Sequence, residues 1–325
     1  MNKNYYEERV NRVLDYVTQH LDGDLSLNTL ARVSHFSPFH FHRIFQSITG
    51  ETVNSYVRRA RLERAAQLMK AAPARRITDI ALDVGNAGLA EFSRAFKAQF
   101  GITASSSDRR APLEISKICK APGDLIFYSV EELEQQKKVL GLNVRIGKLD
   151  RCRYVYHRVF NSYGNEGLMD AYHSLVNWLA KRQTDLNDVV MIGMSPDDPT
   201  ITPAEKCSYD LGVVFPRNAN DQGIVGELLK SRQRGGRSVV MPDRAECESQ
   251  GLTMRDFEDE AVAVLHCVGD ITVVSYAWQY LFRIWLPGSG YQPANLPGFE
   301  VFVRTPEEIG WETFDLYGCL PLVRL

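Results

Sequence analysis

A ten-residue phrase occurs twice in the first hundred residues. Residues 41–50 read FHRIFQSITG and residues 92–101 read FSRAFKAQFG, so each copy places Phe-x-Arg-x-Phe ahead of a glycine five positions later. Short apolar segments and turns precede both copies, at residues 27–34 and 77–84. A short helix, a turn and a second helix that ends at glycine predict a helix-turn-helix, here duplicated. The first third of the chain is therefore expected to be all-α.

The two copies are joined by a longer helix, expected from Thr52 to Met69 because its apolar residues recur every three to four positions. Five basic side chains interrupt this pattern: Arg58, Arg59, Arg61, Arg64 and Lys70. An amphipathic helix is also expected over residues 5–22. We refer to residues 1–111 as the head.

The helix of the first copy begins at residues 37–45, which read SPFHFHRIF. Ser37 is a good N-cap and Pro38 a good first helical residue. Helical spacing then turns four side chains toward the core, namely Phe41, Ile44, Phe45 and Ile48. The opposite stripe suits the major groove of DNA, because Arg pairs with guanine, His and Gln with base edges, and Phe with a thymine methyl group. This stripe holds Phe39, His42, Arg43 and Gln46.

The three nearby histidines raise the alternative of a metal site. His40 and His42 are two positions apart and so point away from each other on a helix, while His35 precedes the helix. Neither an H-E-x-x-H spacing nor a nearby cysteine supports a metal. We therefore expect no metal and no cofactor, and interpret His40 as a packed flank or a phosphate contact.

Charge is unevenly distributed along the chain. Residues 1–112 hold 16 Lys and Arg against 11 Asp and Glu, a net charge of +5, and the remainder carries a net charge of −7. A basic head on an acidic remainder suggests that the head meets a polyanion, although chance variation among solvated residues gives the same figures. The difference also favours docking of the acidic part on the head.

The periodicity changes beyond the head. Residues 112–141 are expected to form a linker, and residues 142–325, the body, contain two segments with the same predicted order of strand, helix, strand, strand. These segments span residues 144–216 and 252–322, and loop-like residues 217–250 join them. The predicted fold is multidomain: an all-α double helix-turn-helix followed by an α+β domain of two repeats that can enclose a cleft.

The head resembles the DNA-binding domain of the AraC/XylS family, on the residues SLNTLARVSHFSPFHFHRIFQSITG and ITDIALDVGNAGLAEFSRAFKAQFG. The body resembles the GyrI-like effector-binding domains, on PDDPTITPAEKCSYD and on WLPGSGY followed by PGFEVF. The first resemblance implies base-edge readers at Phe39, His42 and Arg43. The second implies an aromatic-lined pocket for small, often cationic or lipophilic compounds.

The second copy departs from the AraC/XylS pattern at five positions: Asn86, Gly88, Ala90, Ala104 and Ser107. Gly88 is a weaker N-cap than serine, and Ala90 removes a polar group from a position expected to face bases. Ser93, Arg94 and Lys97 keep the ability to contact phosphates. The first copy is therefore expected to dominate sequence recognition.

A pocket for a lipophilic cation needs aromatic faces and a carboxylate. The GyrI-like resemblance favours an acid in the last strand, at Asp315, with Glu312 as the alternative; either is equally well explained as a solvated residue. The full set of expected effector-binding residues is Tyr209, Trp285, Tyr291, Glu312, Asp315 and Tyr317.

These features indicate a sequence-specific transcription regulator that binds double-stranded DNA and a small effector, with RNA polymerase as a further candidate partner. Its scattered cysteines and lack of a long apolar run favour a cytoplasmic protein that is not in a membrane. The alternative is a GyrI-like hydrolase or drug-sequestering protein with a DNA-binding head. No Ser-His-Asp signature or phosphate-binding glycine loop favours catalysis, so we expect no enzyme.

Overall fold

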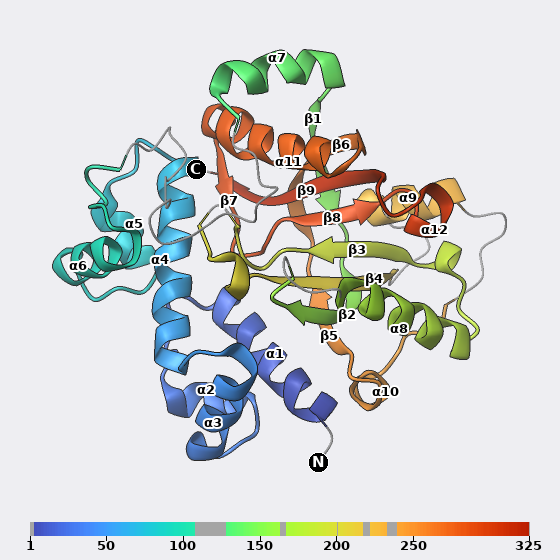
Figure 1. The fold of residues 1–325 in the computed structure, drawn as a ribbon, viewed down its shortest axis with the longest axis horizontal. Helices are drawn as coiled ribbons and strands as arrows, with labels where there is room; N and C mark the ends of the chain where they lie inside the picture. The colour runs from blue at the N-terminus through green and yellow to red at the C-terminus, as the bar shows by residue number, and fades with distance from the viewer. Residues whose placement is uncertain are drawn as a thin grey trace.

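The computed structural model describes residues 3–107, 128–162, 167–199, 201–216, 222–232 and 239–324 (Figure 1). The predicted linker falls partly outside these ranges. Its described end forms helix α7 (Val130–Leu140), which a capping box begins and Gly141 ends. None of the helices in the described ranges is long and apolar enough to span a lipid bilayer.

Within the head, the described residues form six helices: α1 (Lys3–Gln19), α2 (Leu27–Val33), α3 (Pro38–Thr49), α4 (Val53–Ala71), α5 (Ile77–Asp83) and α6 (Leu89–Phe100). The Ser37 hydroxyl accepts a hydrogen bond from the His40 amide at the start of α3. Gly50 and Gly101 end α3 and α6 in the left-handed conformation, as the repeated phrase predicts. The double helix-turn-helix is thus present, with α4 between its two copies.

The turns of the two copies differ. In the first, His35 takes the left-handed conformation at φ 55°; in the second, Gly85 does so at φ 76°. The second turn is one residue longer, with five residues between α5 and α6 against four between α2 and α3. Gly88 begins α6 without a side-chain cap, as the sequence predicts for a glycine at this position.

Each helix-turn-helix has its own apolar core, and the body contributes a side chain to both. Phe41 and Phe45 are fully buried with α1 and the start of α4, and Phe160 from the body packs against this cluster. The second core surrounds Phe92 and Phe96, and Ile201 from the body is buried in it. The cores of the head therefore include residues of the body.

The body is built on one antiparallel sheet whose described strands are β1 (Val144–Leu149), β2 (Cys152–Phe160), β3 (Val190–Met194), β4 (Ser208–Pro216), β5 (Thr253–Phe257), β6 (Glu260–Gly269), β7 (Tyr291–Pro293), β8 (Phe299–Phe302) and β9 (Phe314–Arg324). Their order is β1-β6-β9-β8-β3-β4-β2-β5, with β7 paired to β9. This order is nearly symmetric about the β8–β3 pair, as expected for two repeats. The first strand of each repeat pairs with a strand of the other repeat: β1 pairs with β6, and β5 pairs with β2.

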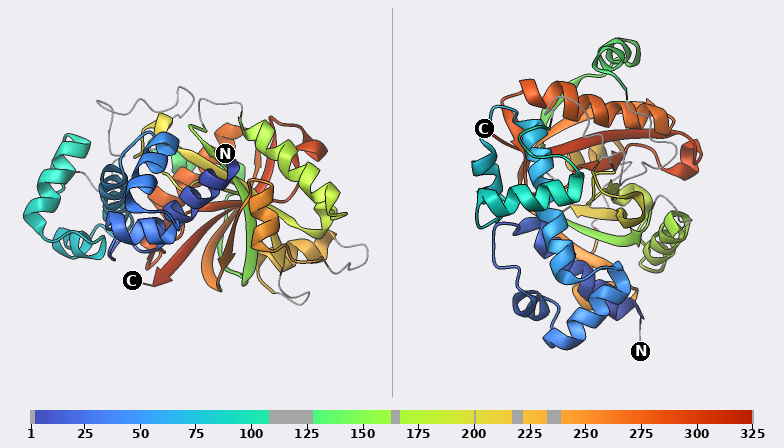
Figure 2. Two further views of the ribbon diagram at one scale, coloured as in Figure 1. Left: turned by 90° about the horizontal axis from the view of Figure 1, so that it is seen from below. Right: turned by 60° about the vertical axis from the view of Figure 1, so that its left-hand side comes forward.

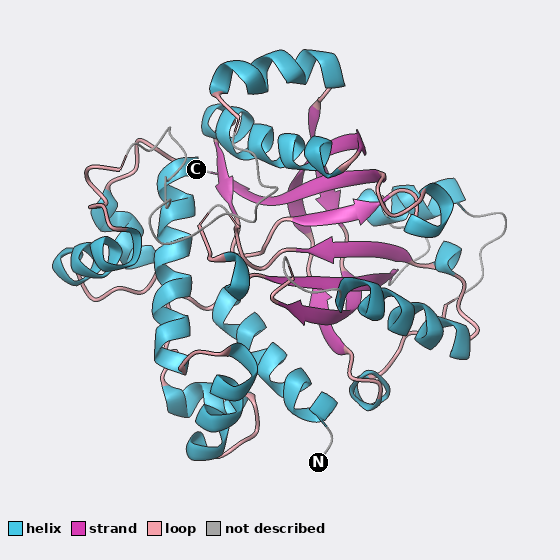
Figure 3. Ribbon diagram, in the orientation of Figure 1, coloured by secondary structure: helices cyan, strands magenta, loops and turns pink. Residues whose placement is uncertain are grey.

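Helices cover both faces of the sheet (Figure 3). Helices α8 (Gly167–Lys181) and α11 (Ile271–Tyr280) share one apolar cluster and so lie on the same face. Helix α9 (Ile224–Arg232) packs on the opposite face, and the short helices α10 (Arg244–Ser249) and α12 (Pro306–Ile309) lie in connections. The head lies against one end of the sheet, with α4 along the border (Figures 1 and 2).

Candidate functional site

The outer stripe of α3 is exposed, as its helical phase predicts. Phe39 is 75% exposed, which is unusual for so large an apolar side chain, and Arg43 and Gln46 are also exposed. The Arg43 guanidinium carbon lies 5.8 Å from the centre of the Phe39 ring. An aromatic ring and a guanidinium side by side on an exposed helix face can contact base edges in a major groove.

The two histidines of this helix differ in their surroundings. His40 is exposed, and its ring lies 5.1 Å from the Phe36 ring and 5.7 Å from the Tyr6 ring, so it packs along the flank of α1. His42 is half-buried. Among the described residues there is no group of three or more His, Cys, Asp or Glu side chains placed to hold a metal ion.

The second recognition helix, α6, exposes Arg94 and Lys97 and half-buries Ser93. Helix α4, which joins the two copies, has 19 residues and so spans about 28 Å. One turn of B-DNA measures about 34 Å. A connecting helix of this length can set two recognition helices at neighbouring major grooves on one side of a duplex.

A cavity of about 1410 Å³ lies between the head and the body. Strands β3, β4, β8 and β9 form its floor, and α8 and α11 flank it. Its remaining wall comes from α4, through residues such as Glu63, Arg64, Gln67 and Lys70. Because α4 is the helix between the two helix-turn-helix copies, a molecule bound at this wall of the cavity contacts the head directly.

Glu63, Asp197 and Asp198 line the cavity on the side of the head, and a further acid, Glu300 on β8, lies in its floor; the sequence did not single out Glu300. Its Oε2 accepts a hydrogen bond from the Tyr209 hydroxyl at 2.6 Å and its Oε1 one from Trp278 Nε1 at 2.9 Å. Burial raises the pKa of Glu300, in spite of these two hydrogen bonds. Among the described residues, no Lys, Arg or His forms an ion pair with it.

Two glycines make room for this arrangement. A Cβ on Gly193 would lie 1.7 Å from the Tyr209 hydroxyl oxygen, so only glycine lets that side chain cross β3 to reach Glu300. A Cβ on Gly298 would lie 2.8 Å from the Trp278 ring. Without side chains at these positions, Tyr209 and Trp278 can hold the carboxylate of Glu300 from two sides.

The structure places Tyr209 at the cavity and the other five predicted effector residues outside it. In β9, Phe314, Leu316 and Leu320 face the cavity, so Asp315 and Tyr317 belong to the other face because neighbouring strand residues alternate. Asp315 instead pairs with Arg304 at 2.6 Å and His266 at 2.8 Å. The structure therefore places Asp315 outside the cavity, whose lining on β8 includes Glu300 instead.

The remaining three predicted side chains lie elsewhere. Trp285 and Tyr291 are half-buried in the apolar cluster next to α4, and Glu312 is exposed in the turn before β9. One signal in the sequence could have drawn attention to Glu300: it is the single charge within the apolar phrase GFEVF. A lone carboxylate in a strand paired on both sides requires an environment built to receive it.

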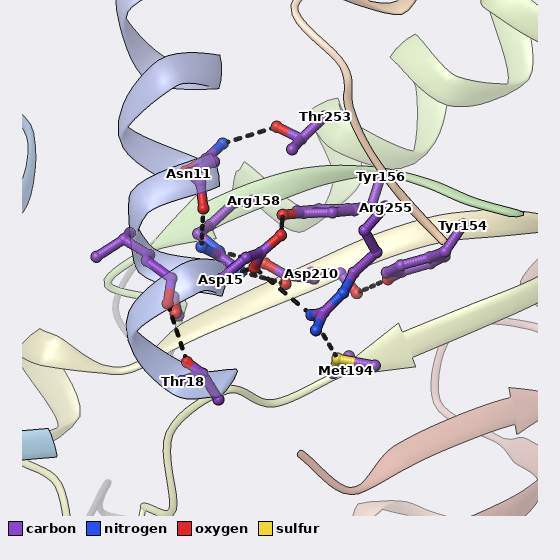
Figure 4. Close-up of polar contacts among 12 residues, drawn as sticks. Asn11, Asp15, Thr18, Tyr154, Tyr156, Arg158, Met194, Asp210, Thr253 and Arg255 are labelled. Atoms are coloured by element: carbon purple, nitrogen blue, oxygen red, sulfur yellow. Dashed lines mark hydrogen bonds and ion pairs between the residues drawn. The ribbon is translucent and has the colours of Figure 1, made fainter. Parts of the chain in front are cut away.

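The head is held to the body by a buried charge cluster (Figure 4). Arg158 on β2 binds Asp210 through Nε and Nη2, both at 2.6 Å, and binds Asp15 of α1 at 2.9 Å. The Tyr156 hydroxyl donates to Asp15 at 2.8 Å, and Arg255 lies 3.5 Å from the same carboxylate. Although burial works to raise the pKa of Asp15, these guanidinium groups hold it below its ordinary value.

A second ion cluster joins α4 to the loop after β3. Arg59 contacts Glu51 at 2.7 Å, Glu63 at 3.1 Å and Asp197 of the body at 3.6 Å. Burial raises the pKa of Glu63 to about 7. The predicted docking of acidic body on basic head is thus seen at Asp197, but the cluster around Asp15 has the opposite polarity.

Both halves of the chain match known protein families. A helix-turn-helix domain matches residues 30–110, and a GyrI-like small molecule binding domain matches residues 142–319. Over 96 residues the chain is 40% identical to the HTH-type transcriptional regulator YbfP of Bacillus subtilis, covering 30% of this chain and 32% of YbfP. Over 100 residues it is 37% identical to the right origin-binding protein of Escherichia coli, covering 31% of this chain and 34% of that protein.

A third relative is matched over nearly its whole length. The chain is 30% identical over 105 residues to the regulatory protein SoxS of Salmonella typhimurium, covering 32% of this chain and 97% of SoxS. The chain thus spans about a third of the first two relatives and almost all of the third.

Proposed function

Since the chain belongs to the AraC-type helix-turn-helix family and carries a GyrI-like small molecule binding domain, we propose that it regulates transcription in response to a small molecule. The head binds double-stranded DNA, with α3 reading bases through Phe39, His42, Arg43 and Gln46. Arg94 and Lys97 of α6 contact phosphates, and Ser93 lies beside them.

The observation that carries the sensing half of this proposal is the environment of Glu300. A buried carboxylate with two neutral hydrogen-bond donors and no cationic partner among the described residues attracts a positive charge. Aromatic side chains around the cavity, including Tyr172, Tyr209 and Trp278, supply apolar and cation–π contacts. The effector is therefore a lipophilic molecule with a cationic group that binds at Glu300.

The test is a titration of the full chain with dodecyltrimethylammonium, followed by tryptophan fluorescence. Glu300→Gln should weaken binding about tenfold to a hundredfold, because the attraction between the two charges is lost. Glu312→Gln serves as the matched control, since Glu312 is exposed and outside the cavity. Equal affinities for wild type and Glu300→Gln would contradict the assignment of the acid.

A second measurement separates sensing from catalysis. The ligand is incubated with the protein, extracted and analysed by mass spectrometry, and transcription from a bound promoter is measured with and without it. A regulator returns the ligand unchanged and alters transcription. Chemical conversion of the ligand would favour the hydrolase alternative instead.

A further inference from the structure

Two cations meet at the seam between α4 and the end of α11. Lys70 lies in the last turn of α4, and Arg283 lies in the π-helical turn Leu281–Trp285 that continues α11. Both side chains line the cavity, and α4 packs against this turn. Burial lowers the pKa of the Lys70 ammonium; the charge of Asp198 opposes this shift and that of Arg283 adds to it. Single π turns of this kind occur often at functional sites.

Neither cation has a carboxylate partner at ion-pair distance in the described part of the chain. Arg283 Nη1 donates to the Tyr128 carbonyl oxygen at 2.6 Å and to Gln279 Oε1 at 3.2 Å, while its buried Nε has no acceptor there. Lys70 forms no hydrogen bond or ion pair with any described residue; the nearest favourable charge acting on it is Asp198.

Two buried arginines, Arg59 and Arg158, differ from this pair because they have carboxylate partners. Arg59 has three carboxylates around it, and Arg158 has two. Placing two like charges near each other without a carboxylate at ion-pair distance costs free energy, and an anion bound between them would offset that cost. Lys70 and Arg283 therefore lack the carboxylates at ion-pair distance that surround Arg59 and Arg158, and both line the same cavity.

We propose that Lys70 and Arg283 form an anion-binding subsite of the cavity, and that the effector carries a carboxylate or phosphate group which binds between them. This inference rests on the proposed function and names a second charge on the ligand, in addition to the cation at Glu300. Arg64 lies on the same wall and, like Arg283, donates to a carbonyl oxygen, that of Pro293 at 2.6 Å, and to an amide oxygen, that of Asn295 at 3.1 Å, so it adds a third positive charge to this part of the cavity.

The subsite also defines how the ligand acts on the head. An anion held by both side chains would tie α4, the connector of the two helix-turn-helix copies, to α11 of the body. Ligand binding would then stabilise one position of α4. A ligand changes DNA affinity only if it stabilises one arrangement of the DNA-binding helices over another.

The experiment uses the full chain and three probes with the same tail: dodecanoate, dodecyl phosphate and dodecyltrimethylammonium, each titrated by calorimetry. In Lys70→Met and Arg283→Gln, affinity for the two anionic probes should fall about tenfold or more, while affinity for the ammonium probe is kept. Dodecanoate and dodecyl phosphate together decide which anion the subsite prefers. Lys181→Met is the matched control, because Lys181 also ends a helix but is exposed.

Thermal unfolding provides an independent readout. Lys70→Met removes an uncompensated charge from a desolvated site, so the variant without ligand should melt at a higher temperature than wild type and gain less from dodecanoate. If the anionic probes bind wild type and Lys70→Met equally, or if only the ammonium probe binds, the subsite is refuted and the proposed function stands. If none of the three probes binds, the proposed function fails and this inference with it.

Discussion

At the scale of single residues, the proposed reading of DNA sequence by α3 depends most on Arg43. It is exposed, it lies beside the exposed ring of Phe39, and it projects from a helix whose other face is fixed by Phe41 and Phe45. Arginine can form two hydrogen bonds to a guanine in the major groove, which gives both affinity and discrimination.

We therefore expect Arg43→Ala to weaken binding to a selected DNA site by about 1–3 kcal/mol while leaving the melting temperature unchanged. The measurement is a gel-shift titration against a site obtained by selection from a random-sequence pool. Arg151→Ala, an exposed arginine of the body, is the control. Unchanged affinity and unchanged sequence preference would remove Arg43 from the recognition surface.

Helical phase made these residues predictable, because Ser37, Pro38 and Gly50 fix where α3 begins and ends. The acid of the cavity was not predictable in the same way. A strand turns successive side chains to opposite faces, so an error of one position exchanges the cavity for the other face. Asp315 and Leu316 illustrate this, because only the second faces the cavity. The pairing of β8 with β3, which sets Glu300 opposite Gly193, joins segments about a hundred residues apart that no local pattern reveals.

At the scale of elements, α4 belongs to three parts of the molecule at once. It contributes to both helix-turn-helix cores and forms a wall of the cavity. Of its five basic residues, Arg58 is exposed, whereas Arg59 is buried among carboxylates and Arg61 binds the Leu21 carbonyl oxygen at 2.8 Å. The sequence of α4 reads as a basic surface helix because most of those partners, Glu51, Asp197 and the Leu21 carbonyl oxygen, lie outside the helix.

Glu63 on α4 should make stability depend on pH. Its pKa of about 7 in the folded chain, against an ordinary 4.5, means that between these pH values the folded chain holds a proton the unfolded chain has released. This contribution is complete below pH 4.5 and is lost as pH rises through 7. It amounts to on the order of 3 kcal/mol.

Glu63→Gln should remove most of this loss, as measured by chemical denaturation at pH 5 and pH 7.5. Glu91→Gln, an exposed position in the first turn of α6, should leave the pH dependence as it is in wild type. A steep fall in the free energy of unfolding that persists in Glu63→Gln would assign the effect to other groups.

The contact of α1 with the sheet is a second test at this scale. Asp15→Asn leaves Arg255 without its carboxylate and Arg158 with one of two, so we expect the free energy of unfolding to fall by about 3 kcal/mol. Chemical denaturation measures this, and Asp22→Asn at an exposed site is the control. A change no larger than that of the control would mean that the cluster contributes little to docking.

At the scale of the whole molecule, DNA and effector are expected to influence each other equally. If the ligand in the cavity changes DNA affinity by some factor, DNA must change ligand affinity by the same factor. The prediction is a difference of about fivefold or more between ligand titrations with and without a bound DNA duplex. Identical titration curves would show that ligand binding in the cavity and DNA binding by the recognition helices are not coupled through α4.

The two repeats of the body and the duplication in the head could both be predicted from the sequence, because each is a local pattern that occurs twice. The relation between head and body was not, because it depends on single side chains such as Phe160 and Ile201 that fit into cores formed far away in the chain. Their own sequence context gives no indication of that destination.

The position of Ile201 has a consequence for biosynthesis. The second helix-turn-helix is translated early, yet the side chain that completes its core is made about a hundred residues later, after part of the sheet. On the ribosome the second core of the head therefore lacks one of its buried side chains until β1, β2 and β3 have been synthesised. A head made without the body would have an incompletely packed second core.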